Sequence, residues 1–100
     1  MLNTVLDADD GNAILRRRAE AAMRDWVGFL AEITRAGQAK GEIRPSVNPE
    51  QLAILIISLL EGGFVSSRLQ RSRDALLLAQ KHLETYLESQ VRSREVDERG

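Results

Sequence analysis

The chain has 100 residues, of which 43% are hydrophobic and 29% are charged, and its formal net charge is -1. This length corresponds to one small domain with a modest core of its own, and the near-neutral charge gives no field for non-specific binding to nucleic acid or membranes. The sequence contains no cysteine, which excludes disulfide bonds and thiolate metal sites and is consistent with a reducing cytoplasm. Abundant Ala, Leu, Glu and Arg with few Gly and Pro predict an all-α fold.

The first segment, residues 1–6, is apolar at Leu2, Val5 and Leu6 and stops at an acidic run. We interpret it as the remnant of a helix whose beginning is missing. The sequence is therefore expected to be part of a longer protein.

A first long helix is predicted over about residues 12–40, with Asn12 as its N-cap and Gly41 as its left-handed C-cap. Its apolar residues recur at helical spacing, and the stripe that they form is expected to face the core. This stripe contains Leu15, Ala19, Ala22, Met23, Trp26, Phe29, Leu30, Ile33 and Gly37. The opposite face, predicted to contact water, contains Arg17, Glu20, Arg24, Ala31, Arg35 and Gln38.

The second predicted helix, residues 48–70, has the clearest start in the chain. Asn48 is its N-cap, Pro49 occupies the first helical position, and Gln51 completes a capping box. The helix is apolar on nearly every side, so we expect it to be covered on at least two sides. Its longest apolar run, residues 52–60, is much shorter than the roughly 20 residues that span a bilayer, which predicts no membrane span.

A third helix is predicted over residues 72–92, with an inner face that includes Leu76, Leu83 and Leu87. Leu78 lies outside this face, beside His82 and Thr85. Residues 93–100 are charged and aperiodic, and we expect them to form a disordered tail.

Several motifs in this order resemble the C-terminal regulatory domain of tetracycline-repressor (TetR) family transcription regulators. They are Trp26, Gly41-Glu42-Ile43, residues 48–53, Leu60-Glu61-Gly62, Leu83 and Tyr86-Leu87. The resemblance covers about residues 2–92 and implies a partial C-terminal domain, residues 1–92, of an all-α TetR-like helical bundle. It also implies a homodimer, a small effector, and operator DNA bound only through an N-terminal helix-turn-helix domain that this sequence lacks.

The resemblance implies that the last two helices, 48–70 and 72–92, pack against their symmetry mates in a four-helix bundle. The residues assigned to this dimer interface are Leu55, Ile57, Leu59, Gly62, Gly63, Ser66, Leu69, Leu78, His82 and Thr85. Gly62 and Gly63 would allow close approach of helices there. The alternative for these two glycines is a bend around the domain's own core.

A pocket for an apolar or amphipathic effector is placed between the first two helices, lined by Met23, Trp26, Phe29 and Phe64. Large, adaptable apolar side chains suit such a concave site. Apolar residues at helical spacing are more often plain core, and this alternative stays open.

No enzyme, cofactor or metal site is expected. His82 is the only histidine and has no cysteine near it, which argues against a metal. Nucleophilic catalysis needs a base beside Ser or Thr with an orienting group, and the sequence shows no such set. The competing interpretation of the whole chain is a small helical protein–protein interaction module unrelated to transcription.

Overall fold

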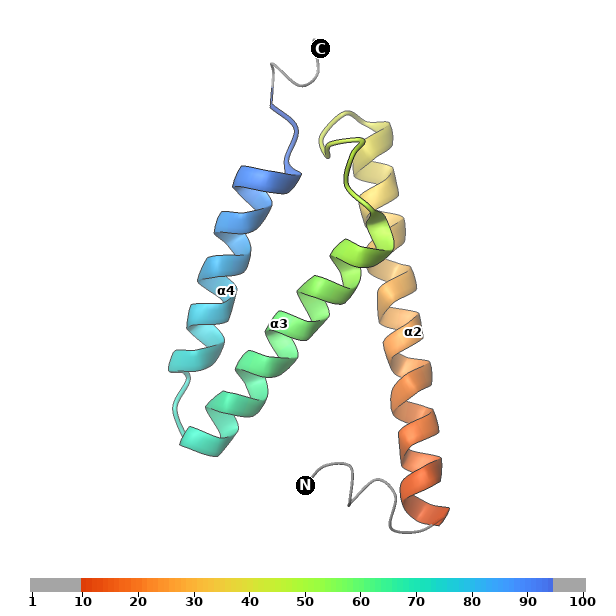
Figure 1. The fold of residues 1–100 in the computed structure, drawn as a ribbon, viewed down its shortest axis with the longest axis vertical. Helices are drawn as coiled ribbons and strands as arrows, with labels where there is room; N and C mark the ends of the chain where they lie inside the picture. The colour runs from red at the N-terminus through yellow and green to blue at the C-terminus, as the bar shows by residue number, and fades with distance from the viewer. Residues whose placement is uncertain (1–9, 95–100) are drawn as a thin grey trace.

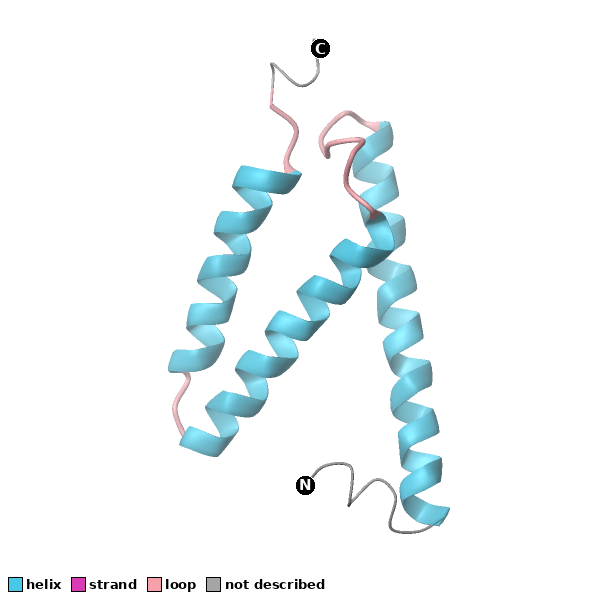
Figure 2. Ribbon diagram, in the orientation of Figure 1, coloured by secondary structure: helices cyan, strands magenta, loops and turns pink. Residues whose placement is uncertain are grey.

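The computed structural model describes residues 10–94, and the described chain consists of helices joined by short loops (Figures 1 and 2). The helices are α2 (Asp10–Ala39), α3 (Pro49–Gln70) and α4 (Asp74–Tyr86), followed by a π-helix, η1 (Leu87–Val91). The predicted all-α architecture is confirmed. The helix remnant predicted for residues 1–6 lies outside the described residues.

The predicted helix boundaries hold to within a few residues, with one change of helix type. α2 begins at Asp10, so Asn12 lies inside the helix and is not its cap. α3 begins as predicted: the Asn48 side chain accepts a hydrogen bond from the Gln51 N–H at 3.0 Å. The third predicted helix is α-helical only as far as Tyr86, and its last turn is the wider η1.

The helices are spread out nearly in one layer. The principal-axis extents of the chain are 55 × 29 × 14 Å, and α2 and α3 diverge from the loop that joins them (Figure 1). Because a domain core needs at least two packed layers, this arrangement encloses little. The buried apolar residues of the described chain are Ala31, Leu52, Ala53, Leu83 and Val91.

The contact between α2 and α3 reverses part of the predicted orientation of α2. Ala31, placed on the water face by the sequence, is 1% exposed, whereas Trp26 and Phe29 of the predicted core stripe are each 58% exposed. Ala31 and the fully buried Ala53 have small side chains, which let the two helices approach closely. Near this contact, Arg35 of α2 forms an ion pair with Glu50 of α3.

The contact between α3 and α4 depends on a glycine. A Cβ atom built on Gly63 would lie 3.0 Å from the Ala79 Cβ and 3.1 Å from the Leu76 Cα. At the end of α3, the Ser67 hydroxyl accepts a hydrogen bond from the Leu76 N–H at 2.9 Å. Arg71 adopts a left-handed conformation there (φ 52°) and ends the helix.

α3 is long and apolar enough to cross a bilayer when judged by length and composition alone. The sequence-based expectation counted only the uninterrupted run before Glu61, and therefore missed that the 22-residue helix has few charges along its length. The central helix of a soluble protein passes the same test, and α3 is the helix that packs against both α2 and α4.

The loop after α2 is tied to the end of η1 by a short antiparallel contact, here called the end junction (residues 42–44 with 89–93). Ile43 and Arg92 form an isolated β-bridge. The Arg44 N–H donates to the Val91 carbonyl at 3.0 Å, and the Ser93 N–H donates to the Glu42 carbonyl at 2.9 Å.

Of the disordered tail predicted for residues 93–100, the structure describes only Ser93 and Arg94. The Ser93 N–H bonds to Glu42, and the Arg94 guanidinium donates to the Ser89 carbonyl at 3.3 Å. Residues 95–100 lie outside the described residues.

Candidate functional site

The predicted effector residues Trp26 and Phe29 lie together on the open face of α2. Their ring centroids are 6.2 Å apart with an interplanar angle of 86°, an edge-to-face pair. With Asp25 they line a shallow, mostly apolar hollow of about 290 Å³. This half of the predicted pocket is therefore an exposed aromatic surface of a single helix.

Met23 lies in a different hollow, between α2 and α3, with a volume of about 670 Å³. Its other lining residues are Leu15, Arg16, Ala19, Glu20, Arg24 and Glu61. Apolar side chains therefore lie among charged ones, an arrangement suited to an amphipathic ligand. Arg16 and Glu20 are 3.9 Å apart as an i,i+4 ion pair.

The structure places Phe64 apart from the other three predicted pocket residues. Its ring lies under the Arg68 guanidinium, 5.6 Å from the centroid, in a cation–π arrangement. The hollow that it lines is at the far end of α3, with Arg71, Arg73 and Leu76 among its neighbours. Met23, Trp26, Phe29 and Phe64 are thus distributed over three hollows.

Six of the ten residues assigned to the dimer interface share one surface depression, here called the α3–α4 hollow. They are Leu59, Gly62, Gly63, Ser66, Leu78 and His82. The hollow measures about 390 Å³ and is almost entirely apolar. Gly63 is at its floor, where it packs against α4 of the same chain, whereas a Cβ on Gly62 would meet nothing within 4 Å.

The other four assigned residues lie elsewhere on α3 and α4. Leu69 is 81% exposed at the end of α3, and Ile57 is half-buried. The Thr85 hydroxyl donates to the Lys81 carbonyl at 3.2 Å, within its own helix. Leu55 lines a separate hollow next to Tyr86.

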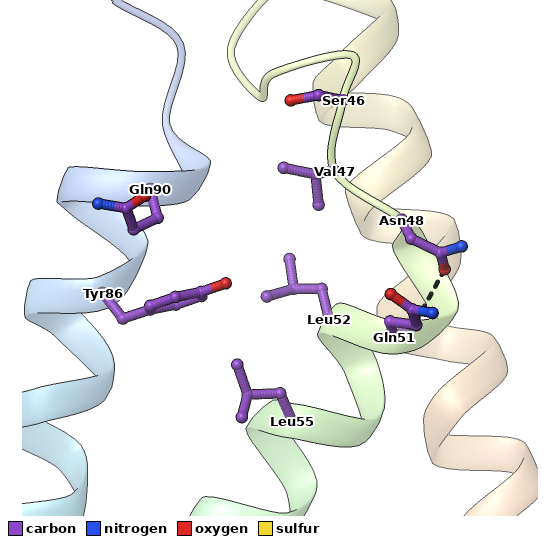
Figure 3. Close-up of a pocket in the computed structure, with 8 residues that line it drawn as sticks. All are labelled: Ser46, Val47, Asn48, Gln51, Leu52, Leu55, Tyr86 and Gln90. Carbon is purple, nitrogen blue, oxygen red and sulfur yellow. Dashed lines mark hydrogen bonds between the residues drawn. The ribbon is translucent and has the colours of Figure 1, made fainter.

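That separate hollow, here called the Tyr86 hollow, was not predicted from the sequence. It has a volume of about 380 Å³ and lies between the start of α3, the loop before it, and the α4–η1 segment (Figure 3). Its lining residues are Ser46, Val47, Asn48, Gln51, Leu52, Leu55, Tyr86 and Gln90. They come from segments about forty residues apart in the sequence, so no local pattern could have joined them.

Within residues 10–94, no three His, Asp or Glu side chains gather in a way that would hold a metal ion. The His82 side chain lies in the α3–α4 hollow. The functional features of the described chain are therefore hollows and open apolar faces.

Comparisons with known proteins agree with this arrangement of helices. The family model described as the tetracyclin repressor-like C-terminal domain matches residues 1–83. The chain belongs to the TetR family. The resemblance stated from its motifs is confirmed, since the matched family model is that of a TetR-like C-terminal domain.

A solved structure gives the same result in three dimensions. The chain is similar to a TetR transcriptional regulator from Chloroflexus aurantiacus J-10-fl, with a TM-score of 0.81 and 39% sequence identity over 93% of the chain. The match covers 47% of that protein, so this chain spans about half of its length. No curated protein matched the chain.

Proposed function

We propose that this TetR-family domain is the homodimerisation and ligand-sensing part of a cytoplasmic, non-enzymatic transcription regulator. In this proposal, residues 1–92 form part of the C-terminal domain. The operator is bound through an N-terminal domain that is not in this sequence, and a small effector releases the regulator from DNA.

The proposal of a homodimer is supported by the incomplete burial of α3. Its sequence is apolar on nearly every side, yet only Leu52, Ala53 and Gly63 of α3 are buried. Contiguous exposed apolar surface of this kind marks interaction sites. The proposed partner is a second copy, because an isologous contact through α3 and α4 would cover the same surface on both chains.

The exposed aromatic face of α2 supports effector sensing. Trp26 and Phe29 are exposed and line a hollow with no residue of α3, and the α2–α3 hollow combines Met23 with charged residues. An apolar or amphipathic effector is proposed to bind between this face and the part of the regulator outside this sequence. If the effector bound one of two arrangements of the helices more tightly than the other, it would shift the equilibrium toward the arrangement that it binds.

The dimer is tested by light scattering over a dilution series with the variants Leu78→Glu and Leu77→Glu. Both leucines are more than half exposed (58% and 53%), so neither substitution should unfold the chain. Only Leu78 lines the α3–α4 hollow. We expect Leu78→Glu to shift the chain to the monomer mass, because a carboxylate cannot be buried without a partner, and Leu77→Glu to remain a dimer.

A folded parent chain that is monomeric at every concentration would contradict the homodimer. It would favour the competing function, a helical module that binds another protein. Circular dichroism of each variant confirms that a change in mass does not come from unfolding.

A further inference from the structure

The Tyr86 hollow faces neither the exposed aromatics of α2 nor the α3–α4 hollow. We propose that it is a second small-molecule site, and that it takes an uncharged, planar ring compound that carries an amide or hydroxyl group. This site shares only Leu55 with the proposed dimer interface and no residue with the proposed effector surface.

The hollow has room for a flat ring. Tyr86 projects from α4 toward α3 with its hydroxyl group directed at Leu52, and Leu55 also lines this side of the hollow (Figure 3). A planar ring can stack on a face of the phenol ring while aliphatic side chains contact the rest of the ligand. The volume, about 380 Å³, lies within the range of small-molecule sites, roughly 300–1,000 Å³.

The polar groups of the hollow specify the charge of the ligand. The lining contains no Asp, Glu, Lys, Arg or His. Within the described chain, the Tyr86 and Ser46 hydroxyls and the Gln51 and Gln90 side-chain amides make no hydrogen bond to protein. Each of these groups both donates and accepts, so the complementary ligand carries neutral donors and acceptors. An ion would give up part of its hydration there and would gain no countercharge from the lining residues.

The walls are fixed before any ligand binds. The Gln38 amide of α2 donates to the carbonyls of Arg44 and Val47 at 3.1 and 2.8 Å, which holds the loop that forms one wall. The end junction ties the same loop to η1: Arg44 donates to the carbonyls of Ser89 and Arg92 at 3.0 and 3.1 Å. A wall that is already ordered loses little entropy on binding, which favours the affinity for a small ligand.

The probe for this site is nicotinamide, a neutral planar ring with a carboxamide, and its control is nicotinate, which has nearly the same shape and a negative charge. Both are titrated into the ¹⁵N-labelled chain, and the amide signals are followed by NMR. We expect saturable shifts of the Gln51 and Gln90 side-chain signals with nicotinamide, and binding at least about tenfold weaker with nicotinate.

Two variants test whether the ligand occupies the hollow. Tyr86→Phe keeps the ring and removes the hydroxyl, and we expect the affinity for nicotinamide to fall by about 2–10-fold. Leu55→Trp is expected to fill the space and to remove saturable binding. Gln80→Ala, an exposed change on α4 outside the hollow, should bind as the parent chain does.

Shifts that do not saturate, or that persist unchanged in Leu55→Trp, would overturn the proposal. So would equal affinity for nicotinamide and nicotinate. Nicotinamide could also bind the dilute monomer and lose its binding at concentrations where the chain dimerises. That result would place the hollow in the interface between copies, and it would overturn the proposal of a small-molecule site. None of these outcomes affects the dimer test with Leu78→Glu.

Discussion

At the residue scale, Gly63 marks a close approach of α3 to α4. Gly63 faces the backbone of α4, and the atoms nearest to its missing Cβ include the Leu76 Cα at 3.1 Å and the Ala75 carbonyl oxygen at 3.2 Å. Backbone atoms cannot avoid an added Cβ atom by a change of rotamer, as a flexible side chain can. Gly63 therefore packs against α4 of its own chain, whereas Gly62 is left on the open surface.

Substitution of Gly63 and Gly28 by alanine separates packing from helix propensity. Both glycines lie inside helices, so each substitution gains about 1 kcal/mol of helix propensity. A Cβ on Gly28 meets nothing within 4 Å, while one on Gly63 meets α4. We therefore expect Gly63→Ala to be about 1–3 kcal/mol less stable than Gly28→Ala.

Urea unfolding of the two variants, at a concentration where the parent is monomeric, measures this difference. Equal free energies of unfolding would show that α4 moves away without cost, which would contradict the close packing of α3 and α4 at this point.

At the element scale, the end junction connects the helix that carries the exposed aromatics with the end of α4. The Arg44 side chain donates to carbonyls of the last turn of the helix, where carbonyl groups have no intrahelical partner. The same last turn is the π-helix, in which the Arg92 N–H bonds to the Leu87 carbonyl at 2.9 Å. A change in the position of the α2 end would thus reach η1 through direct hydrogen bonds.

Arg44→Ala is expected to loosen this connection without unfolding the chain. Loss of its side-chain hydrogen bonds should lower the free energy of unfolding by about 1–3 kcal/mol, the range for bonds with a charged partner. Hydrogen exchange at the Ser93 N–H should become faster, since the Ser93–Glu42 bond is part of the junction.

Arg73→Ala is the matched control, because Arg73 is an exposed arginine at the other end of α4. It should leave exchange at Ser93 unchanged. The same rate at Ser93 in the parent chain and in Arg44→Ala would contradict the role given to the junction.

At the scale of the whole molecule, the open layer of helices leaves large apolar faces on both α2 and the α3–α4 pair. The similar TetR regulator is about twice as long as this chain, since the match covers 47% of it. We therefore expect the additional part of a full-length regulator to cover the face of α2, and a second copy to cover the α3–α4 pair.

Fluorescence quenching of Trp26 tests how the face of α2 is covered. Trp26 is the only tryptophan, and its side chain is more than half exposed. In this chain alone, acrylamide should quench it efficiently. In a longer protein that includes a preceding segment of regulator length, quenching should become weaker. The same quenching in both proteins would show that the aromatic face stays open and would contradict this prediction.

The sequence by itself determined the helices and much of their ends. Helical spacing of apolar residues and local signals such as Asn48-Pro49 act over one or two turns, so they can be recognised without knowing the fold. The order of motifs from Trp26 to Tyr86 was enough for the family resemblance, which the family match over residues 1–83 confirmed. Helical periodicity also placed Leu59 and Gly62 on one face of α3, whereas their association with Leu78 of α4 came from the family resemblance.

Only the tertiary structure decided which sides of the helices meet. The stripe of α2 was judged by hydrophobicity, yet the contact with α3 uses Ala31 because a close approach of two helices selects small side chains. Met23, Trp26 and Phe64 lie in separate hollows because α2 and α3 diverge. The periodicity of apolar residues within each helix does not predict the angle between two helices. The Tyr86 hollow and the end junction join residues about thirty to fifty positions apart, and such contacts exist only once the chain has folded back on itself.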